Sequence, residues 1–265
     1  MTLRALEILE SVDVVAAEDT RVTSRLLDHY RIGSKRLISV HEHNEQRTAP
    51  RVVAELEAGF SVALASDAGT PGFSDPGARL VAAVREAGFP VVPIPGPNAA
   101  AAALSASGLT GSHFLFYGFL AARPAERRAE IEALADCPWM LVFYEAPHRV
   151  IETVADLAAL KGSRRIVIAR EMTKLFETIH MCELATAASW LAEHPDRIKG
   201  EFVLIVEGAQ PDHDAELAQA RRTLEVLLEE LPVKQAASLA SKITGARKNE
   251  LYAMALELKA ANAEG

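Results

Sequence analysis

Short apolar runs alternate with longer amphipathic segments through the first two-fifths of the chain. The β-branched runs of strand length are Val12–Ala16, Leu37–Val40, Val62–Ala65 and Val91–Ile94. Helical spacing of apolar positions lies between and after them, near residues 20–30, 46–58, 76–88 and 97–107. Strands that alternate with helices need crossover connections, so this region predicts an α/β domain with a mostly parallel sheet.

The pattern changes after residue 112. The next strand candidates are Phe114–Leu120, Met140–Tyr144, Ile166–Ala169, Phe176–Leu184 and Phe202–Val206, with helices near 124–135, 148–159 and 185–194. Three shorter helical patterns follow, near 215–230, 233–243 and 247–260, and a glycine turn separates the last two. We therefore expect domains at 1–110 and 113–208, the second with more antiparallel pairing, and a helix-turn-helix-like tail at 215–262.

The composition adds limits to this picture. The 265 residues are 49% hydrophobic and carry a formal net charge of −8, which argues against a protein that coats nucleic acid but allows an enzyme with a local basic face. Acidic residues interrupt the first 20 positions, so no signal peptide is expected. Cys137 and Cys182 are the only cysteines, which favours a reducing cytoplasm over a disulfide framework.

The most informative segment runs from Ser66 to Gly77, with the sequence SDAGTPGFSDPG. It follows a predicted strand and opens a helix, at the end of the sheet where ligands bind in open α/β folds. Its glycines would let backbone approach a ligand closely. A tight strand-to-helix turn without a ligand fits the same pattern.

A second segment of this kind, PIPGPNAA at 93–100, also follows a predicted strand and begins a helix. Pro97 and Asn98 are ordinary helix-start residues, so a simple N-cap turn is the alternative. Two such bends at the ends of neighbouring strands indicate a binding site more strongly than either does alone.

Three charged segments follow other strands, at 17–21, 143–149 and 169–177. Each has an ordinary structural explanation. The first segment would cap a helix, the second would lie on the surface where a helix begins, and the third would be a solvated loop. His41 and His43 have no third ligand nearby in sequence, so no metal site is predicted. The chain also lacks the glycine motifs of P-loop and nicotinamide proteins and the nucleophile elbow of hydrolases.

Taken together, these segments resemble the tetrapyrrole-methylase superfamily and, within it, the branch that methylates 16S rRNA. The matching pieces are AEDTR (17–21), HEHNE (41–45), SDAGTPGFSDPG (66–77), PGPNA (95–99), FYEAPHR (143–149), AREMTK (169–174), GEFVLIVEG (200–208) and the tail at 231–256. The resemblance implies two α/β domains with a cleft between them for S-adenosyl-L-methionine, plus a small C-terminal helical unit. It also implies 2′-O-methylation of a decoding-centre cytidine, a homodimer, and the small ribosomal subunit as partner.

The resemblance, with the strand-end positions, nominates site residues. The cofactor-binding set is Ser66, Asp67, Ala68, Gly69, Thr70, Pro71, Pro95, Gly96, Ala99, Ala100, Phe143, Tyr144 and Glu145. The catalytic set comprises three candidate bases and one candidate cation: Glu18, Glu145, His148 and Lys174. The RNA-binding set is Arg21, Arg149, Lys242, Arg247 and Lys248, with a further basic cluster at Arg123, Arg127 and Arg128.

Two departures from the family pattern stand out. Relatives usually begin with a strand and a TPIGNL-like loop before the helix predicted at 2–10, whereas Met1 stands where that loop should end. We therefore expect the first central strand and one cofactor loop to be absent. Met181 and Cys182 stand where relatives tend to carry Arg-Gly.

Two functions other than methylation of ribosomal RNA fit the sequence. One is methylation of a small-molecule tetrapyrrole, and the other is RNA binding by a protein whose catalysis is impaired by the missing N-terminal segment.

Overall fold

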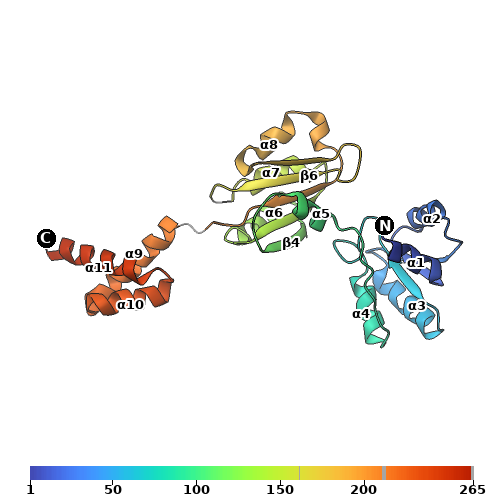
Figure 1. The fold of residues 1–265 in the computed structure, drawn as a ribbon, viewed down its shortest axis with the longest axis horizontal. Coiled ribbons are helices and arrows are strands. Elements are labelled where there is room, and N and C mark those ends of the chain that lie inside the picture. The colour runs from blue at the N-terminus through green and yellow to red at the C-terminus, as the bar shows by residue number, and fades with distance from the viewer. Residues whose placement is uncertain (161, 211–212, 264–265) are drawn as a thin grey trace. The chain divides into compact units, whose positions relative to one another are not determined.

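The computed structural model describes residues 1–160, 162–210 and 213–263 (Figure 1). The chain forms two compact units, one of residues 1–135 and 139–208 and one of residues 136–138 with the helical tail from residue 209. The first unit contains two separate sheets, and the tail is helical. Among the described residues, no helix combines the length and apolar character that a membrane crossing requires.

The N-terminal sheet has three parallel strands in the order β2-β1-β3. Its strands are β1 (Val14–Ala17), β2 (Arg36–Ser39) and β3 (Val62–Ala65). The helices are α1 (Leu3–Ser11), α2 (Thr20–His29), α3 (Glu45–Glu57) and α4 (Ala78–Glu86). The central strand β1 is buried along its whole length, as expected for a parallel strand covered on both faces.

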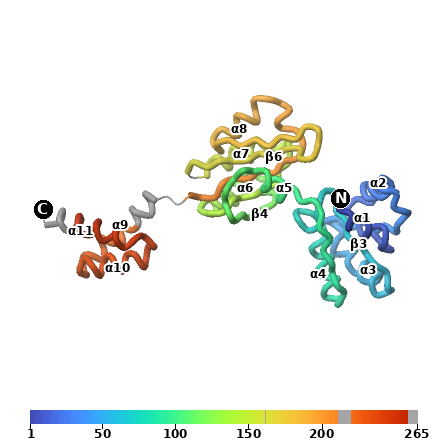
Figure 2. Tube along the Cα trace, in the orientation of Figure 1, coloured from blue at the N-terminus to red at the C-terminus, as the bar shows by residue number. Residues whose placement is uncertain are grey.

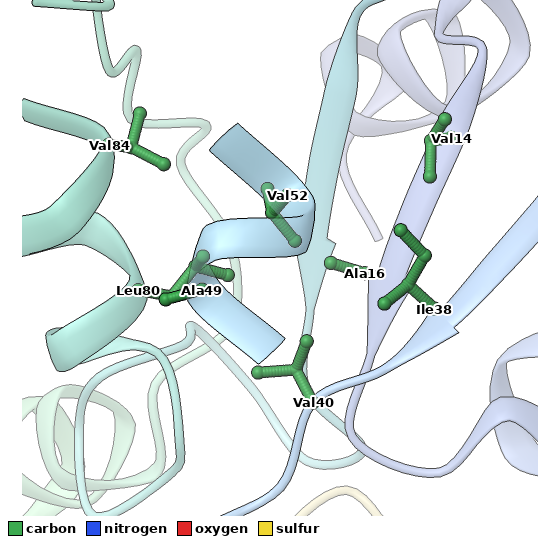
Figure 3. Packing of buried hydrophobic residues seen from close by; sticks show 8 residues of the cluster. All are labelled: Val14, Ala16, Ile38, Val40, Ala49, Val52, Leu80 and Val84. Atoms are coloured by element: carbon green, nitrogen blue, oxygen red, sulfur yellow. The ribbon is translucent and has the colours of Figure 1, made fainter. Parts of the chain in front are cut away.

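The core of this sheet is built from small and β-branched side chains. Figure 3 shows Ala49 and Val52 of α3 between the strand residues and Leu80 of α4. Val14, Ala16 and Ile38 supply the sheet side of the same cluster. A second cluster, around Val15 and Leu27, covers the opposite face with α1 and α2. Because β1 and β3 are parallel, the loops that follow them leave the sheet at the same edge.

The strand predicted at Val91–Ile94 is wrong: these residues lie in the connection from α4 to α5 (Figure 2) and belong to no strand. A β-strand exists only when its backbone bonds to a neighbour, and no described segment pairs with residues 91–94 or with the outer side of β3. The apolar run satisfied the sequence pattern, which carries no information about whether a partner strand is present. The other predicted strands and helices are confirmed, with boundaries that differ by a few residues.

The second sheet has five strands in the order β4-β5-β8-β6-β7. They are β4 (Phe114–Phe119), β5 (Met140–Glu145), β6 (Arg165–Arg170), β7 (Thr178–Glu183) and β8 (Phe202–Val206). Only the β4–β5 pair is parallel, and the other three pairs are antiparallel. This confirms the expected shift toward antiparallel pairing.

Helices cover both faces of the second sheet. Helix α5 (Ala99–Ala106) packs against Val142, Val167 and Val203 on one face. The opposite face carries α6 (Pro124–Ala133), α7 (Val150–Leu157) and α8 (Leu184–Ala192), which contact one another in sequence order. A short 3-10 helix, η1 (Pro195–Ile198), leads into β8. Because β5, β6 and β8 are covered on both sides, they read as continuous apolar runs.

The basic cluster predicted on α6 is partly wrong, because the Arg127 side chain is only 2% exposed. Its Nε lies 2.7 Å from the Asp156 carboxylate of α7, and Glu152 is a second partner. Arg127 therefore joins α6 to α7 and cannot contact RNA. Arg123 and Arg128 remain exposed. Helical spacing alone did not show which of the three arginines faced the core.

The tail consists of α9 (His213–Glu230), α10 (Val233–Thr244) and α11 (Lys248–Ala263). Leu224 and Leu251 pack with a set of buried alanines at its centre. Gly245 ends α10 in the left-handed conformation (φ 77°), which glycine adopts without strain. The chain can therefore reverse within a few residues and begin α11.

Candidate functional site

The loops that follow β1 and β3 are tied together at one edge of the N-terminal sheet. The Asp67 backbone N–H donates to Glu18 Oε2 at 3.1 Å, and the Asp19 N–H donates to Asp67 Oδ1 at 3.3 Å. Parallel pairing of β1 with β3 brings these segments to the same edge. Glu18 thus finds the partner that a carboxylate at the end of an apolar strand requires.

The loop at 66–71 meets the loop at 95–100. The Thr70 hydroxyl donates to the Pro97 carbonyl at 3.1 Å. Gly69 has a φ of 119°, and a Cβ placed on it would lie 3.1 Å from the same carbonyl oxygen. Only glycine combines this conformation with such a close approach. The two glycine- and proline-containing segments therefore form one structure rather than two unrelated turns.

Helix α5 begins at this junction and connects it to the second sheet. The Asn98 side chain caps the helix by accepting a bond from Ala101 N at 2.9 Å. Tyr144 Oη of β5 accepts from Ala100 N at 3.3 Å. Burial raises the pKa of Tyr144, and the nearby Asp75 carboxylate adds to the rise. The phenol therefore stays protonated and can still donate to another group.

Asp75 is a residue of this site to which the sequence pattern assigned no role. It lies on the same loop as Ser66, and burial raises the pKa of its carboxyl above the usual range. The carboxylates of Glu18 and Asp67 raise the pKa further, whereas the Ser66 hydroxyl opposes the rise. Sequence gave one usable signal, a second aspartate within a glycine- and proline-rich loop. Its proximity to Glu18 requires the fold.

Glu45, from the HEHNE segment, holds the far end of the same loop. Its buried carboxylate accepts bonds from Gly77 N at 3.0 Å and Leu80 N at 2.9 Å. These N–H groups open α4, whose own N-cap glycine has no side chain to offer. Among the described residues, no group of histidine, cysteine, aspartate or glutamate side chains could hold a metal ion.

The three consecutive residues Phe143, Tyr144 and Glu145 do not share a face, because strand side chains alternate. Phe143 is buried against Tyr117, and the carboxylate of Glu145 accepts a bond from Thr153 of α7 at 2.6 Å. Tyr144 alone points toward α5 and the loops. The expectation that all three line the cofactor site is thereby corrected for the side chains of Phe143 and Glu145.

Glu145 and Arg149 form an internal pair. Arg149 Nε lies 3.2 Å from the Glu145 carboxylate, and its Nη2 donates to the Leu120 carbonyl at 2.6 Å. The Ala146 N–H also donates a hydrogen bond to the Glu145 carboxylate. With these partners, Glu145 is poorly suited to act as a base and Arg149 to bind phosphate. The pair instead fixes the ends of β4 and β5, and His148 beside it is exposed.

Lys174 lies in the turn after β6, at the same sheet edge as the end of β5. Its ammonium donates to Glu171 and to Glu201, both at 2.8 Å. The Glu171 carboxylate, followed by that of Glu201, raises the pKa of Lys174, so the side chain stays cationic. Glu171 and Thr173 both have positive φ, 51° and 66°. Strain of this kind in non-glycine residues is common at functional loops.

The remaining predicted RNA contacts are on the surface. Arg21 is 84% exposed and pairs with Asp19, whose pKa it lowers. Lys242, Arg247 and Lys248 are exposed around the turn that joins α10 to α11. Arg247 Nη1 lies 3.6 Å from Glu250, a distance at which an exposed pair contributes little. These three cations can therefore meet an external anion.

Comparison with known proteins agrees with this geometry. Residues 1–188 match the family model described as Tetrapyrrole (Corrin/Porphyrin) Methylases, and residues 214–259 match the RsmI C-terminal HTH domain. The Escherichia coli O157:H7 protein named "Ribosomal RNA small subunit methyltransferase I" is 49% identical over 97% of this chain and 90% of its own length. The Vibrio cholerae protein of the same name is 48% identical over 97% of this chain and 90% of its own length.

Solved structures share the fold at lower identity. The methyltransferase CobJ has a TM-score of 0.58 and 21% identity, covering 79% of this chain and 88% of its own. A uroporphyrin-III C-methyltransferase from Thermus thermophilus, solved with S-adenosyl homocysteine, has a TM-score of 0.53 and 18% identity, covering 78% and 90%. These similarities support the fold of residues in the first unit.

The raised pKa of Asp75 predicts an unusual dependence of stability on pH. The folded state binds this proton more tightly than the unfolded state, so ionising Asp75 costs stability as the pH rises through the shifted pKa. Asp75→Asn should therefore be more stable than the wild type at pH 7, and the difference should vanish as the pH falls below the ordinary value of 3.8. Urea unfolding between pH 3 and 8 measures the sign of this difference and its dependence on pH.

Asp13→Asn is the matched control with the opposite sign. Ser61 lowers the pKa of Asp13 by hydrogen bonding, so ionised Asp13 stabilises the fold above its ordinary pKa. That variant should be less stable than the wild type at pH 7 and approach it in acid. Loss of stability in Asp75→Asn at neutral pH would contradict the strained position assigned to Asp75.

Proposed function

Because the chain belongs to the tetrapyrrole (corrin/porphyrin) methylase family, we propose that it is an S-adenosyl-L-methionine-dependent methyltransferase acting on a ribose 2′-hydroxyl of small-subunit ribosomal RNA. Its relatives at 48–49% identity carry the name of a small-subunit ribosomal RNA methyltransferase. The single observation that carries the proposal is the union of the loops at 66–71 and 95–100 beside Tyr144 and Asp75. The finer assignment, to a decoding-centre cytidine, rests on the family resemblance.

The residues at this junction fit the cofactor. Asp67, Ala68, Pro95, Gly96 and Ala99 are exposed and mostly small, so a ligand can approach the backbone closely there. The Asp67 N–H and the Pro95 carbonyl are already bonded to Glu18 and Thr2 and hold the loops in place. The carboxylates of Glu18, Asp67 and Asp75 give this edge a negative potential, which suits a sulfonium cation. We assign the exposed backbone of both loops, together with Ser66, Thr70, Pro71, Ala100 and Tyr144, to the walls of the site.

The bound cofactor supplies an electrophilic methyl group. The chain must hold the ribose oxygen in line with it and accept the hydroxyl proton. Asp75 is the group best suited to take that proton, because its raised pKa makes it a stronger base than a solvated aspartate. Glu18 already accepts the Asp67 N–H and holds the loop in place. Exposed His148 is an alternative base.

Lys174 supplies the positive charge that the reaction needs in this proposal. It remains cationic beside Glu171 and Glu201, and a fixed cation stabilises the negative charge that develops on the ribose oxygen as its proton leaves. With the cofactor bound, its methyl group would pass to the ribose oxygen and its sulfur would leave as a neutral thioether, while Asp75 would accept the hydroxyl proton. Neither transfer requires a metal ion.

The proposal extends to a homodimer in the cytoplasm. Leu175, Phe176, Ile179 and Met181 are exposed around β7, whose outer edge has no partner strand among the described residues. Such a row of apolar side chains on an edge strand normally requires a cover. A second copy of the chain provides this cover by symmetry.

Light scattering should give a dimer mass for the wild type and a monomer mass for the double variant Ile179→Glu with Met181→Glu. A monomeric wild type would contradict this assembly.

Mapping of 2′-O-methylation on ribosomal RNA, with and without the gene, tests the activity. The deletion strain should lose one methylated site, and the wild-type gene should restore it.

Asp75→Asn and Lys174→Met should each lower the single-turnover rate more than about tenfold, which corresponds to about 1.4 kcal/mol of barrier. Lys199→Met is the matched control, since Lys199 also sits in a 2.8 Å ion pair, with Asp196 on η1. Methylation of precorrin-type substrates, with none of the small subunit, would favour a tetrapyrrole enzyme instead.

The tail is proposed to bind RNA phosphates through Lys242, Arg247 and Lys248. Their reversal to Glu should weaken binding to the small subunit and reduce the dependence of affinity on salt, because each lost phosphate contact lowers the salt slope by about one. Arg222→Glu on α9, also exposed, is the control. Unchanged affinity after the triple reversal would leave the tail with a structural role only.

A further inference from the structure

A cluster of four aromatic rings lies beside Asp75, and of these only Tyr144 has a role in the function proposed above. Phe73, two residues before Asp75, is 6.2 Å from Phe116 of β4 between ring centroids. Tyr144 is 5.0 Å from Phe116 and 5.7 Å from Phe119. Phe73 and Phe119 are 50% and 52% exposed. Two rings are thus half open to solvent, and the two rings that link them are more enclosed.

A β-bulge creates this cluster. Phe116 and Phe119 are three positions apart and would face opposite sides of a regular strand. The register with β5 shifts between Phe116 and Gly118, so that Phe119 pairs with Tyr144 while Phe116 pairs with Val142. The extra residue, Tyr117, turns Phe119 onto the face of Tyr144. Bulges that re-aim a side chain are frequent beside active sites.

The bulge also brings the second sheet against the loop that carries Asp75. Gly118 has a φ of 85°, and a Cβ placed on it would lie 2.8 Å from the Ser74 hydroxyl. Ser74 itself has a positive φ of 61°. The backbone at both positions is therefore specialised for this approach, which sets Phe73 and Asp75 next to the rings of β4 and β5.

We propose that Phe73 and Phe119, which are linked through the rings of Phe116 and Tyr144, form a stacking platform for the base of the target nucleotide. The inference rests on the proposed function and names how the substrate is held. A nucleotide inside an RNA helix cannot reach a cofactor on a protein loop, so its base must leave the stack and needs a new one. A base placed on these rings has its own ribose within reach of Asp75, on the same loop as Phe73.

The aromatic set fits a nucleobase better than a buried apolar partner. The rings come from three separate segments, and half of the area of Phe73 and Phe119 stays open. Stacking on aromatic side chains tolerates any base, while the Tyr144 hydroxyl and the Asp75 carboxyl provide polar groups at the rim. The competing occupants are the adenine of the cofactor and a second protein chain, and each gives a different experimental result.

The test uses Phe73→Ala and Phe119→Ala, with small ribosomal subunits from the deletion strain as substrate. Each variant should lower kcat/KM for the subunit by roughly 5- to 150-fold, the range expected for loss of one stacked base. S-adenosyl-L-methionine affinity, measured by calorimetry, should stay within about threefold of wild type, since stacking of the target base leaves cofactor contacts intact. Phe119→Trp should retain activity and Phe119→Leu should not, because only an aromatic ring can stack.

Phe114→Ala is the matched control. Phe114 begins the same strand and is 53% exposed, but it lies at the opposite end of β4 from Phe119. Equal losses in Phe114→Ala, or full activity in Phe119→Leu, would overturn the platform. A fall in cofactor affinity would assign the rings to adenine, and a change in oligomeric mass would assign them to another chain. If the wild-type protein does not methylate the subunit, the proposed function itself is wrong. If the wild type is active and the two alanine variants are equally active, only the platform is wrong.

Discussion

The contact between Gly69 and Thr70 and the carbonyl of Pro97 is the constraint on which the site depends. Thr70 and Pro97 are 27 positions apart in sequence, so their bond joins two separate loops of the first unit. From it, α5 starts in a fixed direction, and the N–H groups at its beginning reach Asn98 and Tyr144. Without the close backbone approach that Gly69 permits, the loop, the helix and β5 would have no common point.

Carboxylates carry the second layer of this organisation. Glu18 holds the turn after β3, and Glu45 holds the beginning of α4, so both ends of the segment at 66–77 are bonded to acidic side chains. Asp75, between them, has the opposite electrostatic situation, since burial and its acidic neighbours disfavour its charge. Two carboxylates thus stabilise the loop, and the third, Asp75, is held where its charge is disfavoured, as the proposed role in proton transfer requires.

Sequence predicted most of the fold because strand and helix periods are local properties. It failed at Val91–Ile94, where a partner strand decides the outcome, and at Arg127, where the direction of one side chain does. At the site, glycine and proline located the loops correctly. Because side chains alternate along β5, the side chains of Phe143 and Glu145 should have been excluded from the face of the sheet that carries Tyr144. The proximity of the Asp75 and Glu18 carboxylates, and the bulge at Tyr117, depend on tertiary contacts that a single sequence does not reveal.

The bulge in β4 has a consequence for how such enzymes can diverge. One residue more or less in this strand inverts the side on which every later side chain of the strand emerges. Removing that residue would send the Phe119 ring toward the helices α6 and α7 and away from Tyr144, with no change in any loop. A scaffold shared by enzymes of different substrates could therefore exchange one recognition surface for another through a single codon insertion or deletion.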